Sequence, residues 1–309
     1  MTAITATPRP VPAWSRYFLD RSEIVGPLFI APAILYVVLL VGLPFLLALY
    51  YSVSAYTIFN PSLAFVGLKN FRDIIASEIF RRTLINTLVF TISAQIIGLL
   101  LGKIGAMLLM QEFHGRGIAR ALVVLPWAVP VSLATVAWLW MFDSLYSVIN
   151  WTLIALGLVD AANRPQWLGQ EDLAMIAVVV VHAWRLFPFG VVIFLAGFTS
   201  VPKDVLDAAT IDGAGFWRRN YQIILPIIAP IVLIALIFGT VFTFTDLSVV
   251  YLLTKGGPIN STQVLGTYAF QVGILSGDVA HGAAICLFLF PFLLIAVILL
   301  LRSLRRREI

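Results

Sequence analysis

Six long apolar stretches, separated by shorter polar segments, set the pattern of this chain. Each is long enough to cross the hydrocarbon core of a bilayer, which is about 30 Å thick. Backbone groups that face lipid must be hydrogen-bonded internally, and the stretches lack the alternation of barrel strands, so each is predicted to be a helix. The pattern predicts an all-α membrane protein with six transmembrane helices, at residues 24–51, 84–110, 118–142, 173–198, 223–253 and 283–301.

Composition supports this reading. The 309 residues are 61% hydrophobic and 11% charged, with a mean hydropathy of +1.00, whereas soluble domains carry about 25% charged residues. The first apolar stretch is longer than the roughly 7–15 residues of a signal-peptide core, so we keep it as a span. The single cysteine, Cys286, excludes an intrachain disulfide and is expected to be a small buried hydrophobe.

The distribution of lysine and arginine predicts the orientation, because cytoplasmic segments of membrane proteins are enriched in them. With a cytoplasmic N-terminus, cytoplasmic segments hold twelve of the twenty basic residues and external segments hold six. Both termini are therefore predicted to be cytoplasmic. The expected domains are a cytoplasmic segment at 1–23, a membrane domain at 24–301 with a cytoplasmic loop at about 199–222, and a basic cytoplasmic tail at 302–309.

Motifs for nucleotide binding and catalysis are missing from the sequence. A phosphate loop requires G-x-x-x-x-G-K-[ST], but the nearest stretch, GLLLGKIG, has three residues between its first two glycines and no Ser or Thr after the lysine. These glycines, Gly98 and Gly102, have the spacing that lets two membrane helices approach closely. No metal-binding spacing surrounds His114, His182 or His281, and no basic and aromatic stripe indicates nucleic acid.

Three ionisable residues fall inside predicted spans, where charge is costly and usually faces protein or a water-filled path. Lys103 is expected to extend toward the headgroups. Arg185 suits either the translocation path or a structural ion pair, and Asp246 suits either the external mouth or simple exposure to headgroup water. An ion-coupled carrier therefore stays open as an alternative, although the internal repeats common in such carriers are not visible.

The loop at 199–222 is unusually polar for this chain. Pro202 suits the first turn of a short helix, and Asp212 with Gly213 suits a sharp turn before a second helix. Two short helices around a glycine turn would project from the membrane as a compact knob. This pattern indicates docking to a partner, with a solvated hairpin that merely joins two spans as the alternative.

The stretch DAATIDGAGFWRRNYQIILP, residues 207–226, resembles the EAA loop of bacterial ABC importer permeases. Asp207 stands where that family has Glu, so the carboxylate is kept but is one methylene shorter. The resemblance implies a helix that couples the permease to an ATP-binding subunit. The matching positions are Asp207, Ala208, Ala209, Asp212, Gly213, Ala214, Ile223, Leu225 and Pro226.

Further segments are similar to the carbohydrate-uptake branch of these permeases, which includes the first membrane subunit of maltose, trehalose and glycerol-phosphate importers. They occur in the family's order: FVGLKNF, INTLVFT, LPWAVP, HAWRLFPF and LLTKGGPINST. The resemblance implies a type I ABC importer permease fold in the bacterial inner membrane. It implies a chain that is no enzyme, binds no cofactor or metal itself, and forms half of a pore for a sugar or polyol.

The same resemblance implies partners. They are a second, similar permease, a dimer of ATP-binding subunits that hold ATP and Mg²⁺, and an extracytoplasmic solute-binding protein. For a neutral, hydroxyl-rich solute, aromatic faces with a few polar groups are expected along the path. The candidates are Trp184, Arg185, Phe242, Phe244 and Asp246. The alternatives from other classes are the ion-coupled carrier and a membrane scaffold without a transport role.

Overall fold

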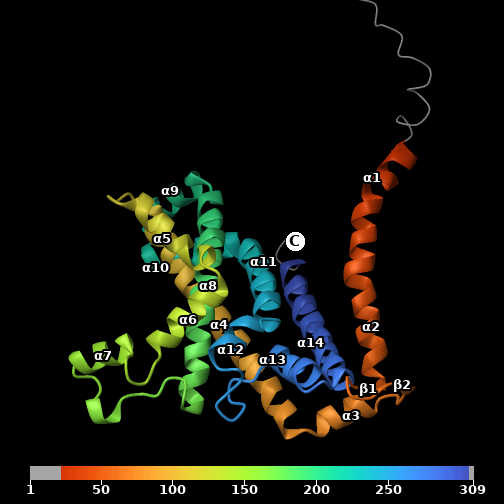
Figure 1. Ribbon diagram of the computed structural model, residues 1–309. Helices are drawn as coiled ribbons and strands as arrows, with labels where there is room; N and C mark the ends of the chain where they lie inside the picture. The colour runs from red at the N-terminus through yellow and green to blue at the C-terminus, as the bar shows by residue number, and fades with distance from the viewer. Residues whose placement is uncertain (1–21, 306–309) are drawn as a thin grey trace, which may run out of the picture.

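The computed structural model describes residues 22–305, which form a bundle of long helices (Figure 1). The expected terminal segments, 1–23 and 302–309, lie mostly outside the described residues. Five helical spans are long and apolar enough to cross a membrane, and each coincides with a predicted span. They are α1 (Ser22–Val37) with the π-helical turn η2 (Val38–Gly42) and α2 (Leu43–Ser52); α4 (Glu78–Met110); α8 (Glu171–Ser200); α10 (Phe216–Arg218) with η4 (Arg219–Ile224) and α11 (Leu225–Phe244); and α14 (Val279–Arg305).

The third predicted span is not one helix. It is broken into α5 (Arg116–Ala128) and α6 (Val131–Met141), which meet at an angle of 100°. Pro130 has no N–H to continue the helical ladder, and the residue before a proline is driven out of the helical region. Val129 is accordingly extended, with φ −82° and ψ 128°. The expectation of a continuous helix over 118–142 is therefore wrong, and the described residues hold five spans, or six if the bent pair counts as one.

The fifth predicted span, 223–253, begins and ends earlier than expected, at Phe216 and Phe244. The helix ends at Phe244, and a second helix, α12 (Ser248–Leu253), follows after a break. The carboxylate of Asp246 accepts a hydrogen bond from the backbone N–H of Val249, 2.9 Å away. An Asp side chain that bonds the nearby backbone competes with a continuous helix. Asp246 thus lies in a break between two helices, and the expectation of a helix continuing to residue 253 is wrong.

Short elements occupy the two ends of the bundle (Figure 1). One end carries an antiparallel hairpin, which departs from the predicted all-α content, together with several short helices. The opposite end carries α9 (Lys203–Ile211), near the start of α5. The short elements away from α9 are β1 (Ser54–Tyr56), β2 (Pro61–Phe65), α3 (Lys69–Ala76), α7 (Val148–Ala155), the 3₁₀ turn η3 (Ala161–Asn163), α13 (Leu265–Phe270) and the π-helical turn η5 (Gln271–Leu275).

The centre of the bundle is the close crossing of α4 and α8. A Cβ atom added at Gly102 would lie 2.6 Å from the Cα atom of Gly190, and one added at Gly98 would lie 3.0 Å from Leu186. The two backbones therefore touch at the glycines, which confirms the predicted small-residue packing. Cys286 departs from expectation, because it is exposed on α14.

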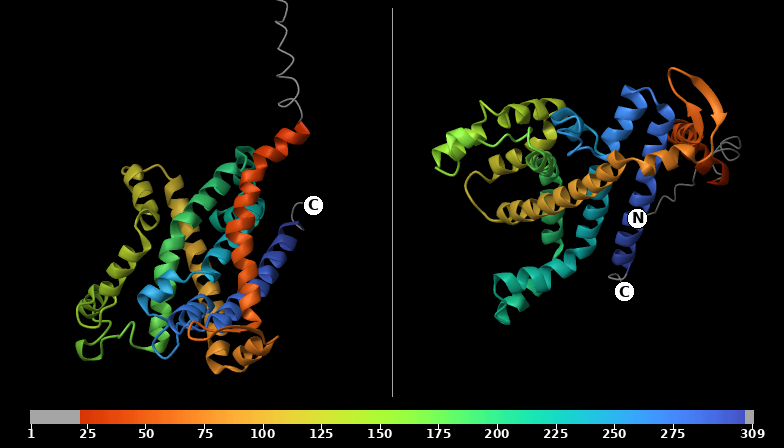
Figure 2. Two further views of the ribbon diagram at one scale, coloured as in Figure 1. Left: turned by 45° about the vertical axis from the view of Figure 1, so that its right-hand side comes forward. Right: turned by 90° about the horizontal axis from the view of Figure 1, so that it is seen from below.

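The first span stands at the side of the bundle (Figure 2). Its lower part, α2, packs against α14, where the rings of Phe45 and Phe290 lie 6.1 Å apart. Between residues 26 and 51 no residue is buried within the chain. This span therefore leaves most of its apolar surface for lipid or for another protein.

Candidate functional site

Two regions collect the residues that the sequence singled out. The first is the α9 loop, residues 201–218, which joins α8 to η4 at one end of the bundle. Pro202 precedes the first turn of α9, where its missing N–H costs no helical hydrogen bond. Leu206 packs with Val201 and Ile224 in a hydrophobic cluster at the base of the loop. The loop is thus fixed to the bundle through its apolar side.

The turn after α9 is closed by the backbone alone. The N–H of Ala214 donates to the carbonyl of Ala209 at 2.9 Å, and the N–H of Gly213 donates to the carbonyl of Thr210 at 3.1 Å. This pair of bonds is the Schellman motif, which requires a left-handed residue after the helix. Gly213 has φ +68°, a conformation that L side chains adopt only at a cost.

The EAA-like residues are divided between the two faces of α9. Ala209 is buried, with 5% of its surface exposed, and faces the bundle. Asp207 and Ala208 are exposed, and Ile211 is 87% exposed. The helix α9 therefore presents small, apolar and acidic side chains outward.

The second region is a cavity of about 310 Å³ between α5, α8 and α11. It lies where the bend after α5 brings Trp127 beside Phe189, with ring centres 6.0 Å apart. Three of the five path candidates line it: Arg185, Phe242 and Asp246. This volume is near the lower limit for a ligand pocket and is lined by aromatic and apolar residues with a few polar groups.

A polar network spans the cavity wall. The Nη1 atom of Arg185 donates to Asp246 at 3.1 Å, so this pair forms an ion pair between α8 and the break after α11. The Nε2 atom of His182 lies 3.0 Å from the hydroxyl of Thr243, and its Nδ1 atom lies 3.8 Å from Asp246. His182 is one turn before Arg185 on α8, and that shared face was the signal that could have added it to the candidates.

The other two path candidates lie outside the cavity lining. Trp184 packs edge-on against Trp138, with ring centres 5.7 Å apart. Phe244 is 4% exposed and belongs to a hydrophobic cluster with Leu265 and Ile285. Lys103 is 9% exposed within the chain, and its ammonium group lies 4.0 Å from the centre of the Tyr221 ring.

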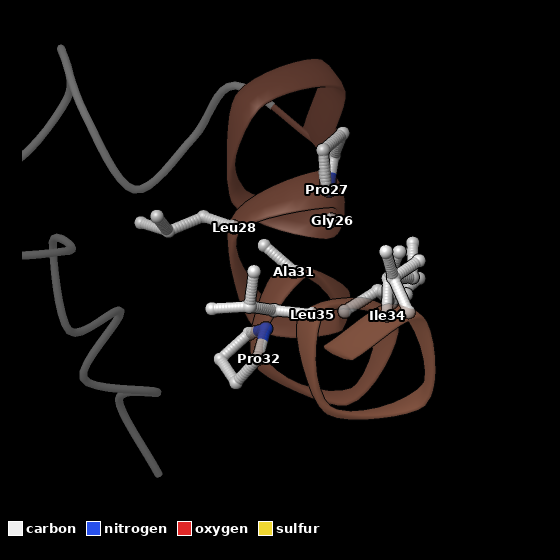
Figure 3. Close-up of a pocket in the computed structure, with 9 residues that line it drawn as sticks. Gly26, Pro27, Leu28, Ala31, Pro32, Ile34 and Leu35 are labelled. Atoms are coloured by element: carbon white, nitrogen blue, oxygen red, sulfur yellow. The ribbon is translucent and has the colours of Figure 1, made fainter. Parts of the chain in front are cut away.

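A hollow of about 940 Å³ follows α1. Figure 3 shows that residues such as Gly26, Pro27 and Leu35 all come from this one helix. A surface made by a single helix and almost free of polar groups has nothing to orient a solute, so we interpret it as a contact surface. Among residues 22–305, no group of three His, Cys, Asp or Glu side chains could hold a metal ion.

Apolar helices long enough to cross a membrane, with a polar network between two of them, indicate a multi-pass membrane protein. Residues 94–308 match the family model described as the binding-protein-dependent transport system inner membrane component, and the chain belongs to that family. Members of this family are permease subunits of the inner membrane rather than enzymes.

Relatives of known name agree with this assignment. The chain is 33% identical over 288 residues to the trehalose/maltose transport system permease protein MalF of Thermococcus litoralis, covering 93% of this chain and 96% of that protein. It is 28% identical to the sulfoquinovosyl glycerol transport system permease protein SmoG of Agrobacterium fabrum, covering 99% of each. A chain in the crystal structure of a bacterial alginate ABC transporter shares the fold, with a TM-score of 0.78 and 19% identity over 94% of this chain and 98% of that one.

Proposed function

We propose that this permease forms half of the translocation pore of an ATP-driven importer for a sugar or a related polyol. The observation that carries the proposal is the α9 loop, a rigid and outward-facing helix in a family of binding-protein-dependent transport components. The named relatives that transport trehalose/maltose and sulfoquinovosyl glycerol support the solute class. The end of the bundle that carries α9 faces the cytoplasm in this proposal.

In this proposal, ATP is bound and hydrolysed by partner subunits. The sequence has no phosphate loop, so ATP and Mg²⁺ bind to a separate pair of ATP-binding subunits. The exposed face of α9 docks on one of these subunits through Asp207, Ala208 and Ile211. When the ATP-bound pair closes, the docked helix moves as a rigid body, and the attached spans exchange an inward-facing for an outward-facing arrangement.

The second half of the pore is a similar but distinct permease. The support for a partner within the membrane is the first span, whose residues 26–51 include none that are buried within this chain. In this proposal the cavity at Arg185 and Asp246 is a half-site, which the second permease completes. An extracytoplasmic binding protein delivers the solute to the end of the bundle away from α9.

Uptake into vesicles that hold the purified complex tests the function. With a solute-binding protein and its sugar outside, uptake requires ATP inside the vesicle and persists when ion gradients are collapsed by ionophores. Uptake driven by an ion gradient in the absence of ATP would support the carrier alternative and contradict the proposal. Full ATP-dependent uptake by a complex without this chain would support the scaffold alternative.

The turn at Gly213 tests the coupling role. Gly213→Val places a β-branched residue at φ +68°, although open space surrounds the position. The left-handed conformation costs roughly 1–2 kcal/mol for such a residue, which lowers the population of the docked geometry about 5- to 30-fold. We expect ATP hydrolysis to continue while solute uptake per ATP falls by a similar factor.

The matched control is Gly213→Asn, because asparagine tolerates the left-handed region. It should retain most of the coupled transport. A separate charge-reversal variant, Asp207→Lys, should uncouple ATP hydrolysis from transport. The conservative variant Asp207→Glu should preserve the coupling. Equal coupling in the Val and Asn variants would show that the turn has no role in docking.

A further inference from the structure

A groove beside the α9 loop has no role in the proposed transport cycle. It has a volume of about 490 Å³ and lies between the last turns of α4 and the α10–η4 segment. One wall is the stripe of Leu100, Ile104 and Leu108, whose spacing places them on one helix face. All three are more than half exposed, at 55%, 55% and 61%. The groove is therefore apolar and open along its length.

A single cation sits at the floor of this groove. Lys103 is 9% exposed, and its ammonium group lies over the ring of Tyr221. Tyr221 is stacked on Trp217, with ring centres 5.8 Å apart. Among residues 26–303, whose side chains the structure describes, no carboxylate lies close enough to Lys103 to form an ion pair. An ammonium group has three donors, so a ring face alone leaves it able to bind an anion.

The position of Lys103 along α4 corresponds to the edge of the hydrocarbon core, next to the lipid headgroups. The 33 residues of α4 span about 50 Å, which exceeds the roughly 30 Å hydrocarbon core by about 10 Å at each end. Lys103 precedes Met110 by seven residues, or about 10 Å. With α4 centred in the bilayer, the backbone of Lys103 therefore lies near the boundary of acyl chains and headgroups, where Trp and Tyr are also enriched.

Basic residues outnumber acidic ones at this end of the bundle, because residues 103–120 and 201–219 hold six Lys or Arg and four Asp or Glu. Arg218 and Arg219 follow Trp217 directly, and Arg116 and Arg120 begin α5. An apolar stripe continuous with the outer surface of a membrane helix suits an acyl chain, and a buried cation next to the headgroups suits a lipid phosphate. A protein partner of this groove would need a carboxylate at the same depth, where charge is costly.

We propose that this groove binds an anionic phospholipid of the phosphatidylglycerol class, with the phosphate at Lys103 and an acyl chain along Leu100 and Ile104. The bound lipid would brace the start of the fifth span, and hence the α9 loop, against α4. The assignment of this lipid to the cytoplasmic leaflet rests on the proposed function. The chemistry of the groove does not depend on it.

Lipid retention tests the proposal without measuring transport. The full-length chain, purified in detergent with the subunits that assemble with it, is exchanged into equal amounts of phosphatidylglycerol and phosphatidylcholine of the same acyl chains. Retained lipid is counted by native mass spectrometry. We expect the wild type to keep phosphatidylglycerol in preference, and Lys103→Met to lower that preference about fivefold.

Two further variants make the result specific. Lys203→Met removes one positive charge from exposed α9, outside the groove, and should keep the preference. Ile104→Trp fills the groove and should lower the retention of both lipids while Lys103 stays in place. Elution of each variant at the volume of the wild-type complex verifies assembly.

Equal retention of the two lipids by the wild type would overturn the proposal. So would an unchanged preference in a folded Lys103→Met variant. A loss of preference in Lys203→Met as large as in Lys103→Met would show general surface attraction rather than a site. Because none of these outcomes depends on ATP or solute, they stay distinct from a failure of the transport proposal.

Discussion

Phe242 and Phe244 lie two residues apart on α11 but have opposite surroundings. Phe242 is 65% exposed and lines the cavity beside Arg185, whereas Phe244 is 4% exposed and packs against the α13 and α14 side. Residues two positions apart on a helix point in different directions. The sequence does not show which of these directions faces the cavity, so both residues were candidates. Their replacement should therefore have different consequences.

We expect Phe242→Ala to raise the solute concentration for half-maximal uptake roughly tenfold, because the site loses an aromatic face worth about 1.4 kcal/mol. The thermal stability of the complex should change little. Phe244→Ala should instead lower stability by about 2 kcal/mol or more, because it leaves a cavity. Uptake kinetics and thermal unfolding of the purified complex measure the two effects. Phe238, one turn away and 55% exposed without lining the cavity, supplies the control Phe238→Ala.

The ion pair of Arg185 and Asp246 predicts a non-additive pair of substitutions. Arg185→Met leaves a carboxylate that is 11% exposed without its cation, which should cost about 1–3 kcal/mol of stability. Asp246→Asn keeps an oxygen that can accept from the Val249 N–H and should cost less. The double variant should be more stable than the sum of the single losses predicts. Additive losses in thermal unfolding would indicate that the two groups act independently.

At the scale of helices, the contact between α4 and α8 is the closest approach of two backbones described above. Their contact depends on the absence of side chains at Gly102 and Gly190, since a Cβ atom at Gly102 would meet the backbone of Gly190. Overpacking of this kind typically costs about 1–3 kcal/mol. We therefore expect Gly102→Ala to lower the thermal unfolding temperature of the complex clearly.

The control for this contact is Gly117→Ala. Gly117 also lies within a helix, α5, but a Cβ atom added there meets nothing within 4 Å. Alanine favours the helix, so this variant should be neutral or slightly stabilising. A loss of stability as large as that of Gly102→Ala would mean that helix crossing distance is not the cause.

Hydropathy predicted the positions of the helices because the bilayer requires long, internally bonded apolar segments. It did not predict which prolines would end a helix. Pro188 and Pro230 lie inside continuous helices, whereas Pro130 separates two helices at 100°. The difference depends on which neighbouring groups satisfy the freed carbonyls, and that is a property of tertiary packing.

The candidate sites divide in the same way. The α9 loop was predictable in outline because its turn is local, determined by Gly213 and the backbone around it. The cavity was not, since it joins Trp127, Arg185 and Asp246 from three segments distant in the sequence. His182 was visible as a residue but had no neighbour in the sequence to indicate its partner Thr243.

At the scale of the whole molecule, the first span is the part whose apolar surface the rest of this chain leaves uncovered. We expect a photo-crosslinking amino acid in place of Ile34, which is 57% exposed on α1, to capture the second permease in the assembled complex. The same probe in place of Phe45, which faces Phe290 of α14, should react mainly within the chain. Mass spectrometry of the crosslinked peptides identifies the partner in each case.

If the probe at Ile34 reacts only with lipid or detergent while the full complex is present, the exposed face of α1 is a lipid surface. The second permease would then have to contact the chain elsewhere.

The bend between α5 and α6 affects the direction in which every later helix crosses the bundle. Together the two short helices pass from the end of the bundle that carries α9 to the end that carries α7 (Figure 1). Had the bent pair turned back instead, α8 would run in the opposite direction and α9 would emerge on the other side from the beginning of α1. The direction of the chain after this bend therefore decides whether the α9 loop and the beginning of α1 lie on the same side of the membrane.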